Sequence, residues 1–454
     1  MIRFLLLFLF ISSLPGYGQE RMANMDSLKQ IMENKRRARQ IYLQNLADNP
    51  KKTLDSVRQA ELERHSASGE EQLEWLKANQ RLDTLKEVDL SYAGLDRVPT
   101  FVYQASNIEK LILNYNNIKK LPAELGHLEH LKSISWRNNA LEDYWWIRIQ
   151  RIPQIETLDL GDNTLTRIPL GVKKLKGLKH LILDHNLLVE IDVKRLSRVD
   201  SLEKLSLNRN HLIEIQEGSY HKLFFLKELY LNRCNIETLD PSFYQLSGLE
   251  KLQMLHNDLS GLPEGISAMQ NLSKLSLYKN EVRRLPLDFF ELEKLEVIDL
   301  YYNKLEVIPP DLAKLKNLEI LYLAHNEVYD VPESIGELNG LKELYLHHNR
   351  LSVLPEGISR LEKLIVIRIN NNYLVDFPDQ ILSLSQLKDI DISNNQITNI
   401  PYDISKLMNL SLFSYNGNEI DFDNRENQKL AVEIHKMIER GVICVPKVSV
   451  ERTQ

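Results

Sequence analysis

The fold of this chain follows from one repeated stretch, of which residues 341–351, LKELYLHHNRL, form a complete example. The pattern L-x-x-L-x-L-x-x-N-x-L, with similar apolar replacements, opens a new unit every 23 or 24 residues. An internal period of this length indicates a stack of structural units that each contact only their neighbours. We number the units as repeats 1 to 15 and count positions from their first residues, Leu85, Ile108, Leu131, Ile155, Leu178, Leu202, Leu226, Leu249, Leu272, Leu295, Leu318, Leu341, Leu364, Leu387 and Leu410.

The alternation within each repeat predicts a short strand. Positions 4 and 6 of an extended chain point to the same face, so both leucines are expected inside. Stacked strands form a parallel sheet at ~4.8 Å per rung, and fifteen rungs give roughly 70 Å along the curve. Most repeats then place a proline after the last apolar residue, which predicts a turn followed by a short helical segment.

This spacing resembles the leucine-rich repeat family over about three quarters of the chain. The resemblance implies an α/β fold, a curved leucine-rich repeat solenoid with a parallel concave sheet and helical terminal caps. The repeats are similar both to those of Ras-pathway scaffold proteins and to typical secreted repeats. The expected organisation is a signal peptide at 1–18, a helical N-terminal cap region at 19–84, the repeats at 85–424, and a C-terminal helical cap and tail at 425–454.

The first eighteen residues have the form of a secretory signal peptide. Arg3 gives a positive start, residues 4–14 are almost entirely apolar, and Gly16 and Gly18 place small residues where a signal peptidase reads. The apolar run is shorter than the ~20 residues that a transmembrane helix needs. We therefore expect a secreted or periplasmic protein with no membrane span after signal removal. Retention of the segment as an anchor, or a cytoplasmic location, is the alternative.

Position 9 is asparagine in nearly every repeat, which predicts a ladder of amides. An asparagine amide can both donate and accept hydrogen bonds where the backbone turns out of the sheet. Repeat 7 has Cys234 in this column, and we expect a buried ladder residue there instead of a reactive thiol. Cys444 lies about nine repeats away along the chain, too far for a disulfide with Cys234.

Charge and motifs narrow the range of functions. A net charge of −6 and a pI near 6.1 argue against a general nucleic-acid binder, for which a basic domain is expected. The sequence contains no G-x-x-x-x-G-K-[ST], G-x-S-x-G or H-E-x-x-H motif, so we expect neither an enzyme nor a cofactor. His325, His347 and His348 come near one another in adjacent repeats. They lack a Cys or carboxylate at ligand spacing, so no metal site is expected.

The strongest candidate surface is a stripe along position 8, which is continuously basic or aromatic from Arg209 to His348. Such residues combine apolar area with polar groups, as binding centres do. A local cationic stripe in a chain of negative net charge favours an acidic or carboxylate-bearing ligand. With flanking tyrosines at position 5, the predicted ligand-binding residues are Arg209, Tyr230, Arg233, His256, Lys279, Tyr302, Tyr322, His325, Tyr345 and His348.

These features predict a secreted or periplasmic module that recognises a protein or peptide ligand on the concave face of the solenoid, with no nucleic-acid partner. Two other functions stay open, an intracellular-type signalling scaffold and a self-associating structural surface protein. Trp145 and Trp146 of repeat 3 form a second candidate contact, for which outer-face packing is the simpler explanation.

Overall fold

The computed structural model describes residues 69–78, 81–120, 122–139, 141 and 152–445. The chain divides into two units, Met1–Ala67 and Ser68–Gln454, and all described residues belong to the second. The predicted signal peptide, most of the N-terminal cap region and the pair Trp145–Trp146 lie outside the described residues. Residues 69–78 are helical and precede the first repeat.

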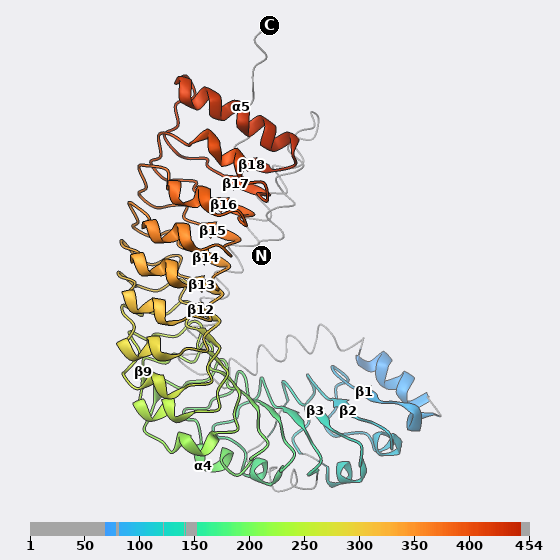
Figure 1. The fold of residues 1–454 in the computed structure, drawn as a ribbon. Coiled ribbons are helices and arrows are strands. Elements are labelled where there is room, and N and C mark those ends of the chain that lie inside the picture. Colours follow the sequence, from blue (N-terminus) through green and yellow to red (C-terminus); the bar gives the residue numbers. More distant parts are fainter. Residues whose placement is uncertain (1–68, 79–80, 121, 140, 142–151, 446–454) are drawn as a thin grey trace, which may run out of the picture. The chain divides into compact units, whose positions relative to one another are not determined.

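Each repeat contributes one short strand to a single parallel sheet, and within the described residues its sixteen strands follow one another in sequence order (Figure 1). The first fifteen strands occupy positions 3–5 of their repeats, where the leucine spacing predicts them. Pairing joins equivalent positions, for example Leu321 with Leu344. The strands are β1 (Glu87–Asp89), β2 (Lys110–Ile112), β3 (Ser133–Ser135), β4 (Thr157–Asp159), β5 (His180–Ile182), β6 (Lys204–Ser206), β8 (Glu228–Tyr230), β10 (Lys251–Gln253), β11 (Lys274–Ser276), β12 (Val297–Asp299), β13 (Ile320–Tyr322), β14 (Glu343–Tyr345), β15 (Val366–Arg368), β16 (Asp389–Asp391), β17 (Leu412–Ser414) and β18 (Ile443–Val445).

The return half of most repeats is a short 3-10 turn, and these turns line the convex side opposite the sheet (Figure 1). Pro309 and Pro332 precede two of them with φ of −65° and −70°, the range that the proline ring imposes. Repeat 5 instead has the helix α4 (Val193–Leu196). The turns are Leu82–Thr84, Thr100–Gln104, Ala123–His127, Leu170–Lys174, Tyr220–Leu223, Pro241–Gln245, Ile266–Ala268, Leu287–Glu291, Pro310–Lys314, Glu333–Glu337, Glu356–Arg360, Asp379–Ser383 and Tyr402–Lys406.

A second, two-stranded sheet forms beside repeats 6 and 7, between β7 (Glu214–Ile215) and β9 (Thr238–Leu239). Most repeats place proline at position 15, and proline has no N–H to donate. Repeat 7 has Asp240 there, and its backbone N–H donates to the carbonyl oxygen of Ile215 at 2.8 Å. The missing proline therefore permits the extra sheet.

The core lies between the sheet and the turns. In repeat 12, the residues at positions 1, 4, 6 and 11 are all fully buried, namely Leu341, Leu344, Leu346 and Leu351. Burying one such side chain contributes roughly 1.5–3 kcal/mol, so the repeated leucines supply most of the stability. Trp136 at position 6 of repeat 3 is also fully buried, as the alternation predicts for that position.

The position-9 asparagines form the predicted ladder. In repeat 10, Asn303 Nδ2 donates to the carbonyl oxygens of Leu277 and Leu300, at 2.9 and 3.0 Å. Its Oδ1 accepts the backbone N–H of Val282 at 3.0 Å. One amide thus joins two neighbouring repeats through groups that would otherwise be buried without a partner.

Cys234 occupies the ladder of repeat 7 as predicted. It is fully buried, and its Sγ donates to the carbonyl oxygen of Leu207 at 3.1 Å. Cysteine has no amide oxygen to accept the N–H of Leu212. This N–H therefore donates to the backbone carbonyl oxygen of Cys234 at 3.0 Å. Burial raises the pKa of the Cys234 thiol to about 12, so the thiol is inert at neutral pH. Cys234 and Cys444 are both free and buried.

After repeat 15 the chain forms the expected helix, α5 (Arg425–Glu439), and then β18, which the leucine pattern does not predict. Helix α5 contacts the last 3-10 turn and β18, and it buries Leu430, Ile434 and Met437. β18 pairs with β17 and adds a sixteenth rung to the sheet. No helix in the described part of the chain is long and apolar enough to cross a membrane.

Charges at position 2, just before the strands, alternate in sign from repeat 1 to repeat 8. Glu156 contacts both neighbours, Lys132 at 3.4 Å and Lys179 at 2.9 Å. Exposed pairs of this kind are worth roughly 0.2–1 kcal/mol each. The alternating residues are Lys86, Glu109, Lys132, Glu156, Lys179, Glu203, Lys227 and Glu250.

Candidate functional site

The position-8 residues, which carry most of the predicted stripe, lie in a left-handed turn after the strands. The strands end at position 5, and position 8 of repeats 1 to 14 has φ between +49° and +59°. This conformation costs about 1–2 kcal/mol for a residue with a Cβ. It allows the position-8 N–H to extend the ladder, as Tyr302 donates to the carbonyl oxygen of Ala324 at 3.0 Å. The position-8 part of the stripe is therefore a column of turn residues, whereas its tyrosines at position 5 lie at the ends of strands.

All ten predicted residues present part of their surface to solvent. They fall into two groups, a cationic group in repeats 6 to 9 and a set of contacting rings in repeats 10 to 12. Arg209, Arg233, Lys279, Tyr302 and His348 are exposed, whereas Tyr230, His256, Tyr322, His325 and Tyr345 are half-buried.

Rings of repeats 9 to 12 stack on one another because equivalent positions lie one rung apart. The ring centroids of Tyr302 and His325 are 4.1 Å apart, and those of His325 and His348 are 4.0 Å apart. Tyr322 and Tyr345 stack at 4.8 Å. We define the aromatic cluster as Tyr278, Tyr301, Tyr302, Tyr322, His325, Tyr345, His347 and His348.

The histidines of the aromatic cluster are neutral at pH 7. Burial, and then the charges of His325, His348 and Arg368, lower the pKa of His347 to about 4. Burial and then His348 lower the pKa of His325 to about 4 as well. Neutral His347 Nε2 lies 2.8 Å from the hydroxyl oxygen of Tyr301, while its Nδ1 is buried without a hydrogen-bond partner among the described residues. Within the predicted stripe, Arg209, Arg233 and Lys279 carry positive charge at pH 7.

The cationic group of repeats 6 to 9 is larger than position 8 alone indicates. Lysines at position 3 lie beside it, and two of them flank Tyr230. The Nζ atoms of Lys204 and Lys251 are 4.8 and 5.2 Å from the centroid of the Tyr230 ring. The Tyr230 hydroxyl donates to Glu228 Oε2 at 2.7 Å. We define the cationic segment as Lys204, Arg209, Arg233, Lys251, Lys274 and Lys279. The sequence prediction does not include its position-3 members because it rests on position 8, although the repeat spacing identifies them.

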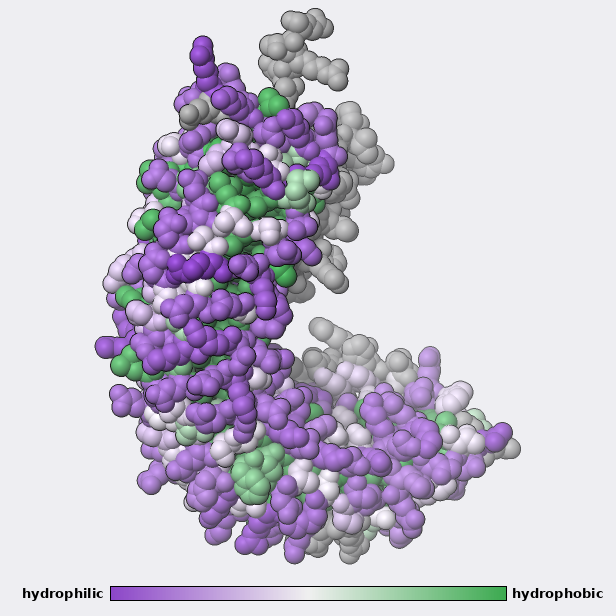
Figure 2. All heavy atoms as spheres, viewed as in Figure 1, coloured by the Kyte–Doolittle hydropathy of each residue, from purple (hydrophilic) through white to green (hydrophobic). Residues whose placement is uncertain are grey.

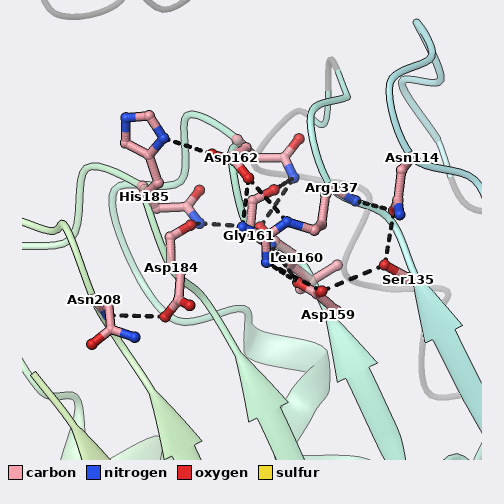
Figure 3. A network of polar contacts seen from close by, with 12 residues as sticks. Asn114, Ser135, Arg137, Asp159, Leu160, Gly161, Asp162, Asp184, His185 and Asn208 are labelled. Atoms are coloured by element: carbon pink, nitrogen blue, oxygen red, sulfur yellow. Dashed lines mark hydrogen bonds and ion pairs between the residues drawn. The ribbon is translucent and has the colours of Figure 1, made fainter. Parts of the chain in front are cut away.

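The sheet face of repeats 2 to 6 carries a different arrangement, a polar network centred on Arg137 (Figure 3). The Arg137 guanidinium contacts Asp159 at 3.2 Å and Asp162 at 2.6 Å, and Asp162 also contacts His185 Nδ1 at 2.6 Å. Burial opposes ionisation of Asp162, but the contacts with His185 and Arg137 outweigh it and lower the pKa of this carboxyl. Gly161 leaves room for the guanidinium, since a Cβ there would lie 2.6 Å from it.

Position-7 side chains extend this network as a second ladder. Asn114 Oδ1 accepts the backbone N–H of Arg137 at 2.9 Å, and Asp184 Oδ1 accepts that of Asn208 at 2.9 Å. Asn208 Oδ1 in turn accepts the N–H of Asn232 at 2.8 Å. The polar network thus pairs its groups with one another. From repeat 8 to repeat 12 position 7 is apolar or aromatic, so the ladder ends where the aromatic cluster begins.

Other surfaces of the described residues have fewer features of a binding site. A cavity of about 360 Å³ opens on the side of repeats 5 and 6, with Glu190, Glu217 and Tyr220 among its lining residues. The face seen in Figure 2 is mostly hydrophilic, with apolar residues in small groups. The described residues contain no group of three or more His, Cys, Asp or Glu side chains that could hold a metal ion.

Profiles of known families match much of the repeat region. The one described as "Leucine-rich repeat region" matches residues 311–440, and "Leucine rich repeat" matches 153–212 and 270–328. A third, "Leucine Rich Repeat", matches residues 225–246. This chain belongs to the leucine-rich repeat family. The family resemblance and the solenoid fold expected from the repeat spacing are therefore confirmed.

Similar proteins include leucine-rich repeat protein 1 of Homo sapiens, which is 39% identical over 61 residues, 13% of this chain and only 15% of that protein. An LRR protein of Leptospira interrogans has a similar structure, with a TM-score of 0.70 and 29% identity over 81% of this chain and 97% of that one. The LRR ectodomain of the Arabidopsis thaliana membrane receptor kinase GASSHO1/SCHENGEN3, in complex with Casparian strip integrity factor 2, has a TM-score of 0.54. It is 25% identical over 71% of this chain and 43% of that one.

Proposed function

We propose that this protein binds a protein or peptide partner through the sheet side of repeats 6 to 13. The observation that carries the proposal is the partly exposed aromatic cluster beside the cationic segment. Tyrosine and arginine are the side chains that most often dominate binding energy, because they bring large area together with polar groups. The complex of the plant ectodomain supports the same type of function by likeness of fold.

Within this surface, Tyr322 and Tyr345 are proposed as the main anchors. They are half-buried and stacked at 4.8 Å, so little side-chain freedom remains to be lost on binding. Arg209, Arg233 and Lys279 are proposed to attract the partner, because charges at an interface act mainly on the association rate. The other predicted residues, His256, Tyr302, His325 and His348, complete the contact surface.

The repeats supply matched substitutions for testing this surface. Serine occupies position 5 in repeats 6 and 9, and asparagine occupies position 8 in repeats 13 and 14. Tyr322→Ser, Tyr345→Ser and Lys279→Asn therefore introduce residues that the same fold already accepts. Asparagine also tolerates the left-handed conformation of position 8.

A partner captured from the source organism would then be titrated against each variant by calorimetry. Each tyrosine replacement should weaken binding by about 2 kcal/mol. Lys279→Asn should slow association and flatten its salt dependence. Lys314→Ala and Glu337→Ala are the controls and should change nothing, since both side chains are exposed and belong to the turns opposite the sheet. Equal losses from controls and tyrosines would place the binding site elsewhere.

We further propose that the protein is secreted or periplasmic, on the basis of the signal-like residues 1–18. Mass spectrometry of the native protein should find a mature chain that begins near Gln19. Intact Met1 on the cell-extracted protein would contradict export. Light scattering on the same sample separates a monomeric binding module from a self-associating surface protein.

A further inference from the structure

The sheet side of repeats 6 to 13 consists of two chemically different segments, and we infer that its partner is an extended polypeptide with an acidic half and an apolar, aromatic half. The acidic half meets repeats 6 to 9, and the apolar half meets repeats 10 to 13. This inference rests on the proposed function and specifies the ligand that the same surface recognises.

The cationic segment supplies the first half of the argument. Positions 3, 5, 7 and 8 of repeats 6 to 9 hold six cationic side chains and a single carboxylate, Glu228. That carboxylate already accepts from the Tyr230 hydroxyl at 2.7 Å and pairs with Lys204 at 3.3 Å. The segment therefore has a large excess of positive charge in a chain whose net charge is −6. Carboxylates of a ligand are its natural complement.

Repeats 10 to 13 supply the second half. Their position-3 and position-5 residues are mostly apolar or aromatic and half-buried, and we define the apolar segment as Val297, Ile320, Tyr322, Tyr345 and Val366. The three charged side chains at these positions have partners within the chain. Asp299 accepts from Ser276 Oγ at 2.6 Å, and Glu343 accepts from the Tyr345 hydroxyl at 2.8 Å. Arg368 pairs with Asp389 at 2.5 Å. Apolar side chains of a ligand can thus pack here without depriving a charge of its partner.

The orientation of the rings indicates which apolar side chains fit. His325 has Tyr302 stacked on one face and His348 on the other, so only its ring edge is left for a ligand. Aromatic rings prefer to place a face on such an edge, which favours an aromatic side chain in the apolar half. Single-stranded nucleic acid stacks its bases flat on open ring faces, and both faces of His325 are already covered.

The length of the ligand follows from the rung spacing. Repeats 6 and 13 are seven rungs apart, about 34 Å at ~4.8 Å per rung, and an extended chain advances ~3.3 Å per residue. About ten residues therefore cover both segments, roughly five on each.

Three fluorescent ten-residue peptides of one composition test the inference with the purified protein. Two carry five acidic residues and five apolar residues, two of them phenylalanine, as separate blocks in the two possible orders. The third alternates the same residues. At least one block peptide should bind about tenfold more tightly than the alternating peptide, because only a block places every side chain on its matching segment.

Variants assign each block to its segment. Arg233→Asn with Lys279→Asn should weaken the block peptide and reduce the slope of its affinity against salt concentration. Tyr322→Ser with Tyr345→Ser should weaken it by a similar factor and leave the salt slope unchanged. Lys314→Ala with Glu337→Ala is the matched double control.

Equal affinities for all three peptides, or no binding of any up to about 1 mM, would overturn the inference. Equal changes of the salt slope in both double variants would overturn it as well. The proposed function is judged separately. If the tyrosine variants lose a captured partner while the peptides bind alike, the binding surface stands and the division into two segments fails.

Discussion

The polar network of repeats 2 to 6 and the aromatic cluster of repeats 9 to 12 occupy equivalent positions of the same scaffold, yet their side chains relate differently to the chain. Arg137, Asp162 and His185 find their partners in adjacent repeats at 2.6 Å. In the aromatic cluster, the rings stack on one another, and their residues are exposed or half-buried. The leucine core beneath is the same in both regions, so the difference lies in what covers it. We interpret the polar network as structural and the aromatic cluster as the surface for binding.

The largest expected effect is in the polar network. Arg137→Ala leaves two half-buried carboxylates without their cation and should lower the free energy of unfolding by about 3 kcal/mol. Gly161→Ala keeps the charge of Arg137 but displaces its guanidinium, and should lower the free energy of unfolding by a smaller amount. Chemical denaturation measures both. Neither variant should change ligand affinity, and a loss of binding in Arg137→Ala would mean that the two regions are not separate in function.

The asparagine ladder is present in both regions, so the loss of one of its amides should cost a similar free energy of unfolding in each. Asn139→Ala and Asn303→Ala remove the same set of bonds to neighbouring repeats, and each should cost about 2 kcal/mol of unfolding free energy. Cys234→Ser should cost less, because the Leu212 N–H is already paired with the backbone there. Thermal melts rank the three. A larger loss for Cys234→Ser than for Asn303→Ala would refute our account of the ladder.

The two regions should also respond to acid at different pH. The pKa of His347 is about 4 in the folded chain, below its ordinary value of about 6.5, so the unfolded state takes up the proton first as pH falls. The resulting stability is complete above pH ~6.5 and is lost towards pH ~4, by about 1 kcal/mol after solvent screening. The lowered pKa of Asp162 acts only below about pH 4. Denaturation curves from pH 7 to 4 should be flatter for His347→Gln than for the wild type, and identical curves would contradict this assignment.

An effect of similar size concerns one hydrogen bond of the aromatic cluster. Tyr301→Phe removes the hydroxyl that lies 2.8 Å from His347 Nε2 and should cost about 1 kcal/mol of unfolding free energy. His347→Phe removes a half-satisfied imidazole and should be neutral or slightly stabilising. Thermal melts compare the two. If His347→Phe destabilises the fold more than Tyr301→Phe, the histidine has a structural role like that of the polar network.

The leucine spacing was sufficient to predict the strands, because burial at positions 1, 4 and 6 depends only on the period of the pattern. β18 escaped prediction because residues 441–445 contain no leucine and carry only part of that pattern. The left-handed conformation of position 8 was not predicted, because bulky residues such as Arg233 and Lys279 occupy most of the column, although Gly417 and three asparagines in it carry the signal. The neutral state of His347 depends on burial and on residues of adjacent repeats, such as His325 and Arg368, which lie 22 and 21 residues away in sequence. The local sequence pattern therefore predicted the scaffold. The chemistry of the surface could not be predicted in the same way, because it depends on contacts between neighbouring repeats.

The alternating charges at position 2 mean that an even number of consecutive repeats must be removed if neighbouring charges are to remain opposite. Removal of one of repeats 2 to 7, for example repeat 4, would bring two like charges together at the junction, here Lys132 and Lys179. Removal of two consecutive repeats would bring Lys132 beside Glu203 and keep the alternation intact. In this half of the chain, pairs of repeats are the modules that can be gained, lost or exchanged without a mismatch of charge.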